Sequence, residues 1–388
     1  MPIKNRFADL LPEITEWRRD LHEHPEILFE THRTSAIVAE KLAEFGCDEV
    51  ATGIGRTGVV GIIKGKTDTS GRTVGLRADM DALPILEATG VPYASKTPGA
   101  MHACGHDGHT AMLLGAAKYL AETRNFDGRV AVIFQPAEEG GGGGREMVDD
   151  GMMDRFSIDE VYGMHNQPNL PLGQFRIRPG AFYAATDLIE ITVTGQGGHA
   201  AKPHEVIDTT LVASHIIIAL QSIVSRNTHP VDQCVVSITS FQTDGTAINV
   251  IPQVVELKGT VRTMKPETRD MAEARLSLIA QNTAAAFGAS AEVTYRRNYP
   301  AMVNAERETE YAANAARTVA GECDTEAEMT MGGEDFAFML LARPGAYIEV
   351  GNGPGAAVHH PKYNFNDEAI PHGCSYWATL VEQRLPVA

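Results

Sequence analysis

The sequence is poor in aromatic residues and in positive charge. Phenylalanine, tryptophan and tyrosine make up only 6% of the residues, so few rings are available for stacking on nucleic-acid bases. The chain has 33 lysines and arginines against 50 acidic residues, and its formal net charge is −17. Such a charge gives no general attraction to nucleic acid or to an anionic membrane, and we expect neither as a partner.

Cysteine is also scarce, and long apolar runs are missing. The five cysteines are odd in number and widely spread, which is not the pattern of a disulfide framework and suits a reducing compartment. No apolar run approaches the roughly 20 residues of a membrane-spanning helix. The first 26 residues contain acids throughout and no apolar core, unlike a secretory signal. These absences predict a cytoplasmic protein.

The 388 residues are enough for two domains. In the first half, strand-like and helix-like stretches alternate, which predicts an α/β layer fold with a mostly parallel sheet. We expect a helix that starts with Asp107 as its N-cap. The other predicted elements are a helix over residues 34–45 and strands over residues 59–63, 73–78, 129–135 and 160–165.

The middle of the chain has the order β-α-β-β-α-β, the split unit that buries a small core of its own. Its predicted elements are strands at 188–194, 234–241, 254–263 and 291–295 and helices at 206–225 and 266–287. We predict an inserted domain, residues 184–295, within a larger domain formed by residues 1–183 and 296–388. The alternative is two consecutive domains with a C-terminal extension.

A thiol and an imidazole lie two residues apart in Cys104-Gly105-His106. Both side chains reach one divalent ion if the chain turns, and glycine permits that turn. Sulfur and nitrogen ligands suit zinc, without excluding manganese, cobalt or nickel. We interpret the neighbouring His102 and His109 as structural residues or as residues that support the ligands without binding metal.

Acidic side chains follow two predicted strands. Asp79 and Asp81 stand at a strand end, where a carboxylate binds metal or orients a ligating imidazole; an Asx turn is the alternative. Glu138 and Glu139 follow another strand and precede glycines 140–144, which we expect to keep the space before them clear. Adjacent side chains point in different directions, so one acid can bind metal while the other takes a proton from water.

Histidines complete the candidate site. His165 follows the next strand, and either His359 or His360 approaches from the C-terminal segment; a structural histidine and a surface loop are the alternatives. Together the candidate ligands number five, which is more than a catalytic zinc site with an open position uses. They are Cys104, His106, Glu139, His165 and one of the two histidines His359 and His360. Two ions that share ligands fit better.

The inserted domain carries a glycine-rich segment, GQGGHAAKPH, that contains His199. A histidine delivered by a mobile domain is able to donate a hydrogen bond to an oxyanion. The alternative is a glycine-rich loop with an incidental histidine.

Six strings, in this order along nearly the whole chain, carry a family resemblance: LRADMDALPI, MHACGHDGHTAMLLGAA, FQPAEEGGGG, GQGGHAAKPH, GGEDFAF and VHHPKYNFND. They resemble the hippurate hydrolase and auxin-conjugate hydrolase branch of the di-metal aminoacylase and carboxypeptidase family. The resemblance implies a catalytic α/β domain with an inserted ferredoxin-like lid that often dimerises, and hence a homodimer or homotetramer.

The resemblance also implies a ligand set and two ions (zinc, manganese, cobalt or nickel). The implied ligands are Cys104, which bridges the ions, His106, Glu139, His165 and His359. The late histidine is His359 because the family pattern is histidine, any residue, proline. Asp79 and Cys104 stand where other branches have a histidine and a bridging aspartate, which marks this branch.

The remaining implied roles concern catalysis and substrate. Glu138 is the general base and acid. Asp81 orients the ligands without binding metal itself. His199 donates a hydrogen bond to the oxyanion, across a dimer interface. Asn249 and Glu334 lie near the substrate.

The expected reaction is hydrolysis of an N-acyl amino acid, hippurate-like or N-acetylated, to an amino acid and a carboxylate. A dipeptidase or carboxypeptidase with the same metal centre is one alternative, and an N-acetyl-diaminopimelate-type deacetylase is another. A metal-binding module without catalysis is disfavoured, because a binding site needs no acid to transfer protons.

Overall fold

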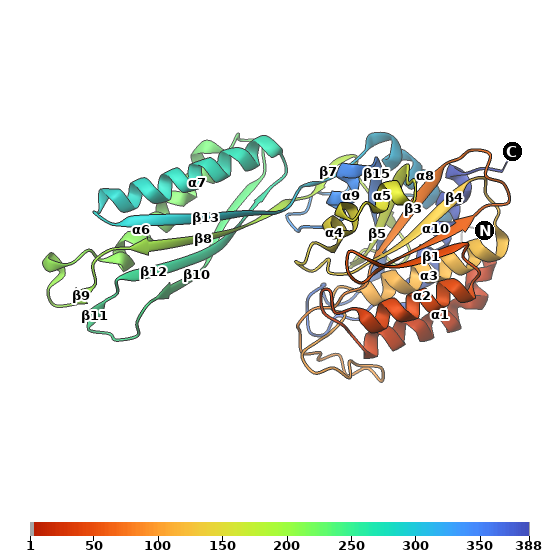
Figure 1. Cartoon of the computed structure of the whole chain (residues 1–388), viewed down its shortest axis with the longest axis horizontal. Coiled ribbons are helices and arrows are strands. Elements are labelled where there is room, and N and C mark those ends of the chain that lie inside the picture. Colours follow the sequence, from red (N-terminus) through yellow and green to blue (C-terminus); the bar gives the residue numbers. More distant parts are fainter. Residues whose placement is uncertain (1–3, 388) are drawn as a thin grey trace. The chain divides into compact units, whose positions relative to one another are not determined.

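The computed structural model describes residues 4–387, which form two compact units (Figure 1). Unit 1 consists of residues 4–180, Val303–Glu328 and 335–387, and unit 2 of Ala181–Met302 and Met329–Glu334. Each unit has its own buried apolar core. The short strands β7 (Gly180–Tyr183) and β14 (Met302–Asn304) lie where the chain passes between the units.

Unit 1 is built on a seven-stranded sheet with the order β1-β2-β4-β3-β5-β15-β6. The four central strands run parallel, while β1, β2 and β6 are antiparallel to their neighbours. The predicted α/β layer fold with a parallel sheet at its centre is therefore confirmed. The strands are β1 (Glu49–Ile54), β2 (Gly58–Lys64), β3 (Thr73–Asp79), β4 (Arg129–Gln135), β5 (Glu160–Pro168), β6 (Phe175–Arg176) and β15 (Gly345–Gly353).

Helices cover this sheet, and α3 packs against four of its strands as well as against α1 and α10. Because it is enclosed in this way, most residues of α3 are buried, including the polar His106, Asp107 and His109. Helix α4 packs on α9. The helices of unit 1 are α1 (Asn5–Glu23), α2 (His32–Glu44), α3 (His106–Thr123), α4 (Gly143–Asp149), α5 (Met152–Arg155), α8 (Glu306–Ala320), α9 (Ala337–Ala342), η3 (Asp367–Ala369) and α10 (Ile370–Arg384).

The start of α3 differs from the prediction. The N-cap is Gly105, in the left-handed region at φ 93°, and Asp107 lies inside the first turn. The carboxylate of Asp107 instead accepts hydrogen bonds from His22 Nδ1 at 2.8 Å and from Arg18 at 3.4 Å, both on α1. The N-cap prediction was wrong because this tertiary pairing outweighs a local capping bond.

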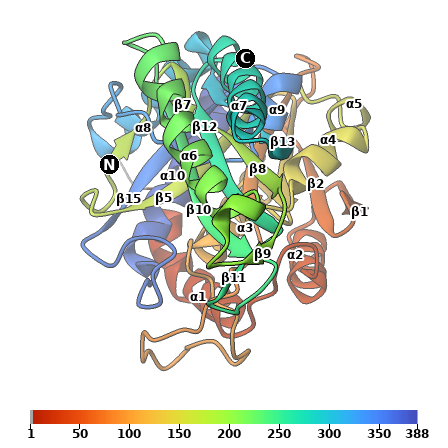
Figure 2. The same cartoon turned by 90° about the vertical axis from the view of Figure 1, so that its left-hand side faces the viewer.

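Unit 2 contains a four-stranded antiparallel sheet with the order β10-β12-β8-β13. Helices α6 and α7 pack side by side on one face of it, as Figure 2 also shows. The chain order β-α-β-β-α-β and this strand order are those of the predicted ferredoxin-like unit. Its elements are β8 (Ala185–Thr194), β9 (Gly198–His199), η1 (Pro203–Glu205), α6 (Thr209–Ser222), η2 (Ile223–Asn227), β10 (Cys234–Thr243), β11 (Val250–Ile251), β12 (Val254–Thr263), α7 (Pro266–Ala286) and β13 (Ser290–Tyr299).

Helix α6 begins three residues later than predicted. Asp208 is its N-cap, and its carboxylate accepts hydrogen bonds from Thr210 N at 2.9 Å and Leu211 N at 3.2 Å. Together α6 and η2, Thr209–Asn227, are long and apolar enough to cross a membrane by length and composition, with a mean hydropathy of 1.3. The sequence analysis predicted a helix over residues 206–225 but found no apolar run of nearly membrane-spanning length. Its buried side chains belong to the core of unit 2, and core helices pass the same test.

Candidate metal centre

The five proposed ligands come together in unit 1, at the carboxyl edge of the parallel strands, where open α/β sheets place their sites. Two groups of three ligand atoms form, and within each group the atoms lie within 4.8 Å of one another. The first group is Cys104, His106 and His165, and the second is Cys104, Glu139 and His359. Cys104 is common to both groups.

The Cys104 thiol faces His165, with Sγ 3.3 Å from Nε2. The other ring nitrogen of His165 donates to the carbonyl of Asn166 at 2.6 Å, so that Nε2 is the ring nitrogen that faces the thiol and would bind a metal. Burial and the Glu139 carboxylate raise the pKa of the thiol, but His165 and His106 outweigh them and lower the pKa to about 6. A thiolate is the form that binds metal.

His106 has the same arrangement. Its Nδ1 donates to the carbonyl oxygen of Asp81 at 2.8 Å, which leaves Nε2 as the acceptor. This Nε2 is buried without a hydrogen-bond partner, 3.7 Å from Asp79 Oδ2 and 4.0 Å from Glu139 Oε1. Burial lowers the pKa of His106, but Asp79 and Cys104 raise it well above the ordinary value. Surroundings that favour an imidazolium also favour a divalent cation.

His359 rather than His360 approaches the cluster. His359 Nε2 lies 3.3 Å from Glu139 Oε1, an atom that is buried without a hydrogen-bond partner. The backbone of His359 has φ 65°, and its N–H donates to the carbonyl of Ala103 at 2.7 Å. His360 Nδ1 instead accepts from the N–H of Lys362 at 3.0 Å.

Asp81 holds the two adjacent acids in place. Its carboxylate oxygens accept from the N–H of Glu138 at 2.9 Å and of Glu139 at 3.1 Å. The Glu138 side chain is buried. One of its carboxylate oxygens lies within 4.8 Å of a ligand atom of His106 and of Glu139. The predicted strand-end position of Asp81 therefore places one carboxylate behind both acids.

The glycines after Glu139 do not all leave space free. A Cβ on Gly143 would lie 1.8 Å from the carbonyl oxygen of Pro136, whereas one on Gly140 would meet nothing within 4 Å. The expectation of open space holds at Gly140 and is wrong at Gly143. There, close approach of two backbone segments requires glycine.

His109 has no ring nitrogen left for a metal. Its Nδ1 donates to Asp79 Oδ1 at 2.6 Å, and its Nε2 accepts from the backbone N–H of Asn166 at 3.0 Å. Asp79 is also paired with the buried guanidinium of Arg77 at 2.8 Å. Arg77 and Asn166 were missed by the sequence analysis, and the only available signal was their position beside Asp79 and His165.

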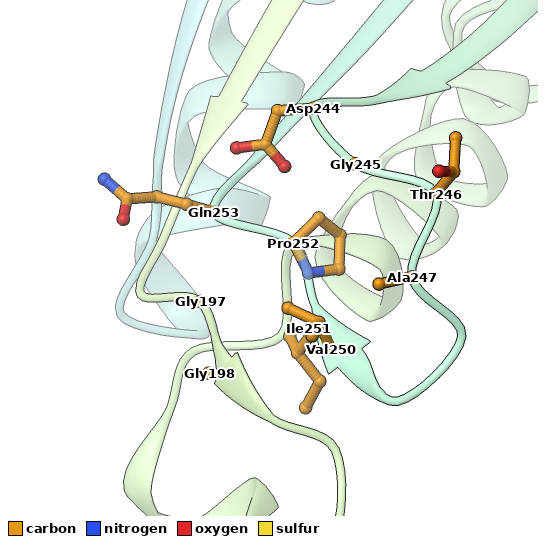
Figure 3. Close-up of a pocket in the computed structure, with 10 residues that line it drawn as sticks. All are labelled: Gly197, Gly198, Asp244, Gly245, Thr246, Ala247, Val250, Ile251, Pro252 and Gln253. Carbon is orange, nitrogen blue, oxygen red and sulfur yellow. The ribbon is translucent and has the colours of Figure 1, made fainter.

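The three other predicted site residues belong to unit 2. His199 and Asn249 are exposed on the ribbon formed by β9 and β11, where the N–H of Ala200 donates to the carbonyl of Asn249 at 3.1 Å. Glu334 is buried at the end of unit 2, next to Asp335. Figure 3 shows a pocket of about 400 Å³ near the ribbon, lined by residues 197–198, 244–247 and 250–253.

The cluster fits divalent metal. The buried ligand atom His106 Nε2 has no hydrogen-bond partner, and leaving a buried polar atom unpaired is unfavourable. The thiol of Cys104 has a lowered pKa. Thiolate, imidazole and carboxylate are together a ligand set for zinc and similar ions.

An α/β sheet with such a cluster at its carboxyl edge and an inserted ferredoxin-like unit defines a class of metal-dependent hydrolases. Residues 75–383 match the family described as peptidase family M20/M25/M40, and the chain belongs to this family.

Individual relatives match almost end to end. The chain is 41% identical to the hippurate hydrolase of Campylobacter jejuni, over 96% of this chain and 97% of the relative. It is 40% identical to an N-acetylcysteine deacetylase of Bacillus subtilis, over 94% of each. Among solved structures, the Bacillus subtilis YxeP protein, described as a dinuclear metal-binding peptidase of the M20 family, matches with a TM-score of 0.85. That match has 36% identity and covers 98% of this chain and 100% of YxeP.

Proposed function

We propose that this enzyme hydrolyses the amide bond of N-acyl amino acids, releasing an amino acid and a carboxylate. The observation that carries the proposal is the Glu138–Glu139 pair, held from behind by Asp81 at 2.9 and 3.1 Å beside the ligand groups. One acid of such a pair can bind metal while its neighbour transfers protons. The names of the two relatives above support the substrate class, since hippurate and N-acetylcysteine are both N-acyl amino acids.

We propose that two divalent ions bind, with Cys104 as the shared ligand. One ion would take His106 and His165, and the other would take Glu139 and His359, following the two ligand groups. When bound, the ions supply Lewis acidity that polarises the amide carbonyl and makes water a better nucleophile. The thiolate favours zinc, and manganese, cobalt and nickel are also accepted by such ligands.

In the proposed mechanism, Glu138 moves the proton. Its carboxylate takes a proton from the attacking water as the new C–O bond forms, and then delivers it to the amine nitrogen as the C–N bond breaks. His199 is the proposed oxyanion donor. The Nδ1 of His199 accepts from the N–H of Ala201 at 3.1 Å, so in the neutral ring the proton is on Nε2, ready to donate to the oxyanion.

His199→Ala is expected to lower kcat by about 10²–10³-fold, the usual loss for one oxyanion donor, with a smaller effect on KM. Steady-state kinetics on the best substrate would measure this. The exposed His204 on the same segment offers a matched control, and His204→Ala should keep wild-type rates. Equal kcat values for His199→Ala and the wild type would remove His199 from the mechanism.

A substrate panel tests the reaction itself. Hippurate, N-acetylcysteine, other N-acetyl amino acids, N-acetyldiaminopimelate and unblocked dipeptides would be compared by kcat/KM with the metal-loaded enzyme. We expect N-acyl amino acids to be cleaved best. A higher kcat/KM for dipeptides would identify the enzyme as a peptidase. A clear preference for N-acetyldiaminopimelate would identify it as a deacetylase of that biosynthetic intermediate.

We propose that a second copy of the chain covers an apolar face of unit 2, giving a homodimer or a homotetramer. Leu211 and Ile218 on α6 are 50% and 69% exposed, and β10 is an edge strand of its sheet. Exposed apolar patches and open strand edges favour association. The double variant Leu211→Asp/Ile218→Asp should sediment as a monomer, whereas Leu86→Asp, at an equally exposed apolar residue of unit 1, should not change the mass. An unchanged mass for the double variant would refute this interface.

We propose a cytoplasmic location. All five cysteines are free, and Cys104 has to remain a thiolate to serve as the proposed ligand. A reducing compartment preserves this ligand. Fractionation of the native cells would test it, and recovery of the enzyme outside the cytoplasm would contradict it.

A further inference from the structure

Asn166 directly follows His165 in β5, and its side chain is completely buried. Its Nδ2 donates to the carbonyl of Cys104 at 2.7 Å, and its Oδ1 accepts from the Tyr363 hydroxyl at 2.6 Å. Only this orientation of the amide gives the Cys104 carbonyl a donor. Asn166 thus joins three segments that are far apart in the sequence: the Cys104 turn, the end of β5 and the loop that carries His359.

The backbone of Asn166 acts on the same site. Its carbonyl accepts from His165 Nδ1 at 2.6 Å, and its N–H donates to His109 Nε2 at 3.0 Å. His109 in turn donates to Asp79 at 2.6 Å. Both polar groups of the backbone and both ends of the side-chain amide of this one residue are therefore engaged around the proposed ligands.

The turn at Cys104-Gly105-His106 packs closely against the side chains of Asn166 and Tyr363. A Cβ on Gly105 would lie 2.4 Å from Asn166 Nδ2 and 2.5 Å from the Tyr363 hydroxyl, so only glycine allows the amide and the phenol to approach. The φ of Gly105 is 93°, which also favours glycine. The turn that presents Cys104 and His106 is thus packed directly against Asn166 and Tyr363.

We propose that Asn166 and Tyr363 are positioning residues that set the separation between the Cys104 thiol and the ring nitrogens of His165 and His359. The inference rests on the metal centre of the proposed function. Without the hydrogen bond from Asn166 Nδ2, the carbonyl of Cys104 loses its donor. The backbone at Cys104 can then rotate, which moves the thiol. A displacement of about 1 Å is enough to weaken a site of this kind. Tyr363 holds the Asn166 amide in the orientation that makes this bond.

Titration of the apoprotein with Co²⁺, followed by the thiolate-to-cobalt absorption in the near ultraviolet, tests the inference independently of activity. Asn166→Ala is expected to weaken cobalt binding by about 10–100-fold and to reduce the thiolate band. Tyr363→Phe should shift binding in the same direction by less, since the amide remains.

Asn304→Ala is the matched control. Asn304 is also buried in unit 1, donates to the carbonyls of Arg178 and Tyr347 at 2.9 and 3.0 Å, and accepts from Tyr347 N at 2.7 Å. It has a similar structural role, but its hydrogen bonds go to Arg178 and Tyr347 and not to a proposed ligand, so its removal should lower stability but leave the cobalt titration unchanged.

The outcomes separate the two proposals. If the wild type shows no thiolate band, the metal centre itself is refuted. If the wild type shows the band and Asn166→Ala titrates like Asn304→Ala, the positioning role is refuted. Should Asn166→Ala fail to fold, Tyr363→Phe decides, and a titration identical to that of the wild type overturns the inference.

Discussion

Replacing Glu138 with glutamine is expected to lower kcat by about 10²–10⁴-fold, the range of general acid–base catalysis by one residue. Glutamine has nearly the same shape and keeps the backbone N–H that donates to Asp81 at 2.9 Å. It cannot take a proton from water or return one to the amine. Because the same group serves in both steps, the loss should lie toward the upper end of this range.

Metal content distinguishes this result from damage to the site. Elemental analysis of Glu138→Gln should find as much metal as in the wild type. Glu139→Gln is the matched control, since it changes the adjacent acid, whose Oε1 lies in the ligand groups; it should lower metal affinity as well as rate. Near-normal turnover by Glu138→Gln would show that another group transfers the proton.

Removing the metal is expected to abolish turnover and to lower the thermal midpoint of unit 1. Without a cation, His106 Nε2 remains buried with no hydrogen-bond partner, and the nearby carboxylates lose a compensating charge. A ligand present at 1,000 times its Kd stabilises the folded state by about 4 kcal/mol. Dialysis against a chelator, followed by calorimetry and assay, would measure both effects, and Zn²⁺, Mn²⁺, Co²⁺ or Ni²⁺ should restore them.

Cysteine variants show whether the effect arises at the proposed ligands. Cys104→Ala should remove most of the difference in thermal midpoint between the metal-loaded and the chelated protein. Cys374 is equally free and buried in the core, where its thiol donates to the carbonyl of Met112 at 3.2 Å. Cys374→Ala should lower stability while leaving that difference intact. Full activity after exhaustive chelation would refute a metal-dependent mechanism.

The sequence alone was sufficient to predict the α/β layer fold, the inserted β-α-β-β-α-β unit and the class of reaction. Strand and helix periodicity is local, so the order of elements can be predicted from it. Polar residues directly after apolar strands, as at Asp81 and Glu138, indicate a site because parallel strands end at one edge of the sheet. The pattern of motifs added the family, which the comparisons confirm.

Only the tertiary structure decided which neighbouring residue faces which group. Position along the chain left either His359 or His360 open, and only the family pattern favoured His359; the structure places His359 beside Glu139, at 3.3 Å. Asp107 looks like a helix cap until α1 brings His22 to it, at 2.8 Å. Asn166 gave no signal beyond its position next to His165, because its side-chain amide meets partners up to 197 residues away. Side-chain direction and long-range pairing depend on how the elements pack, and periodicity along the chain does not contain that information.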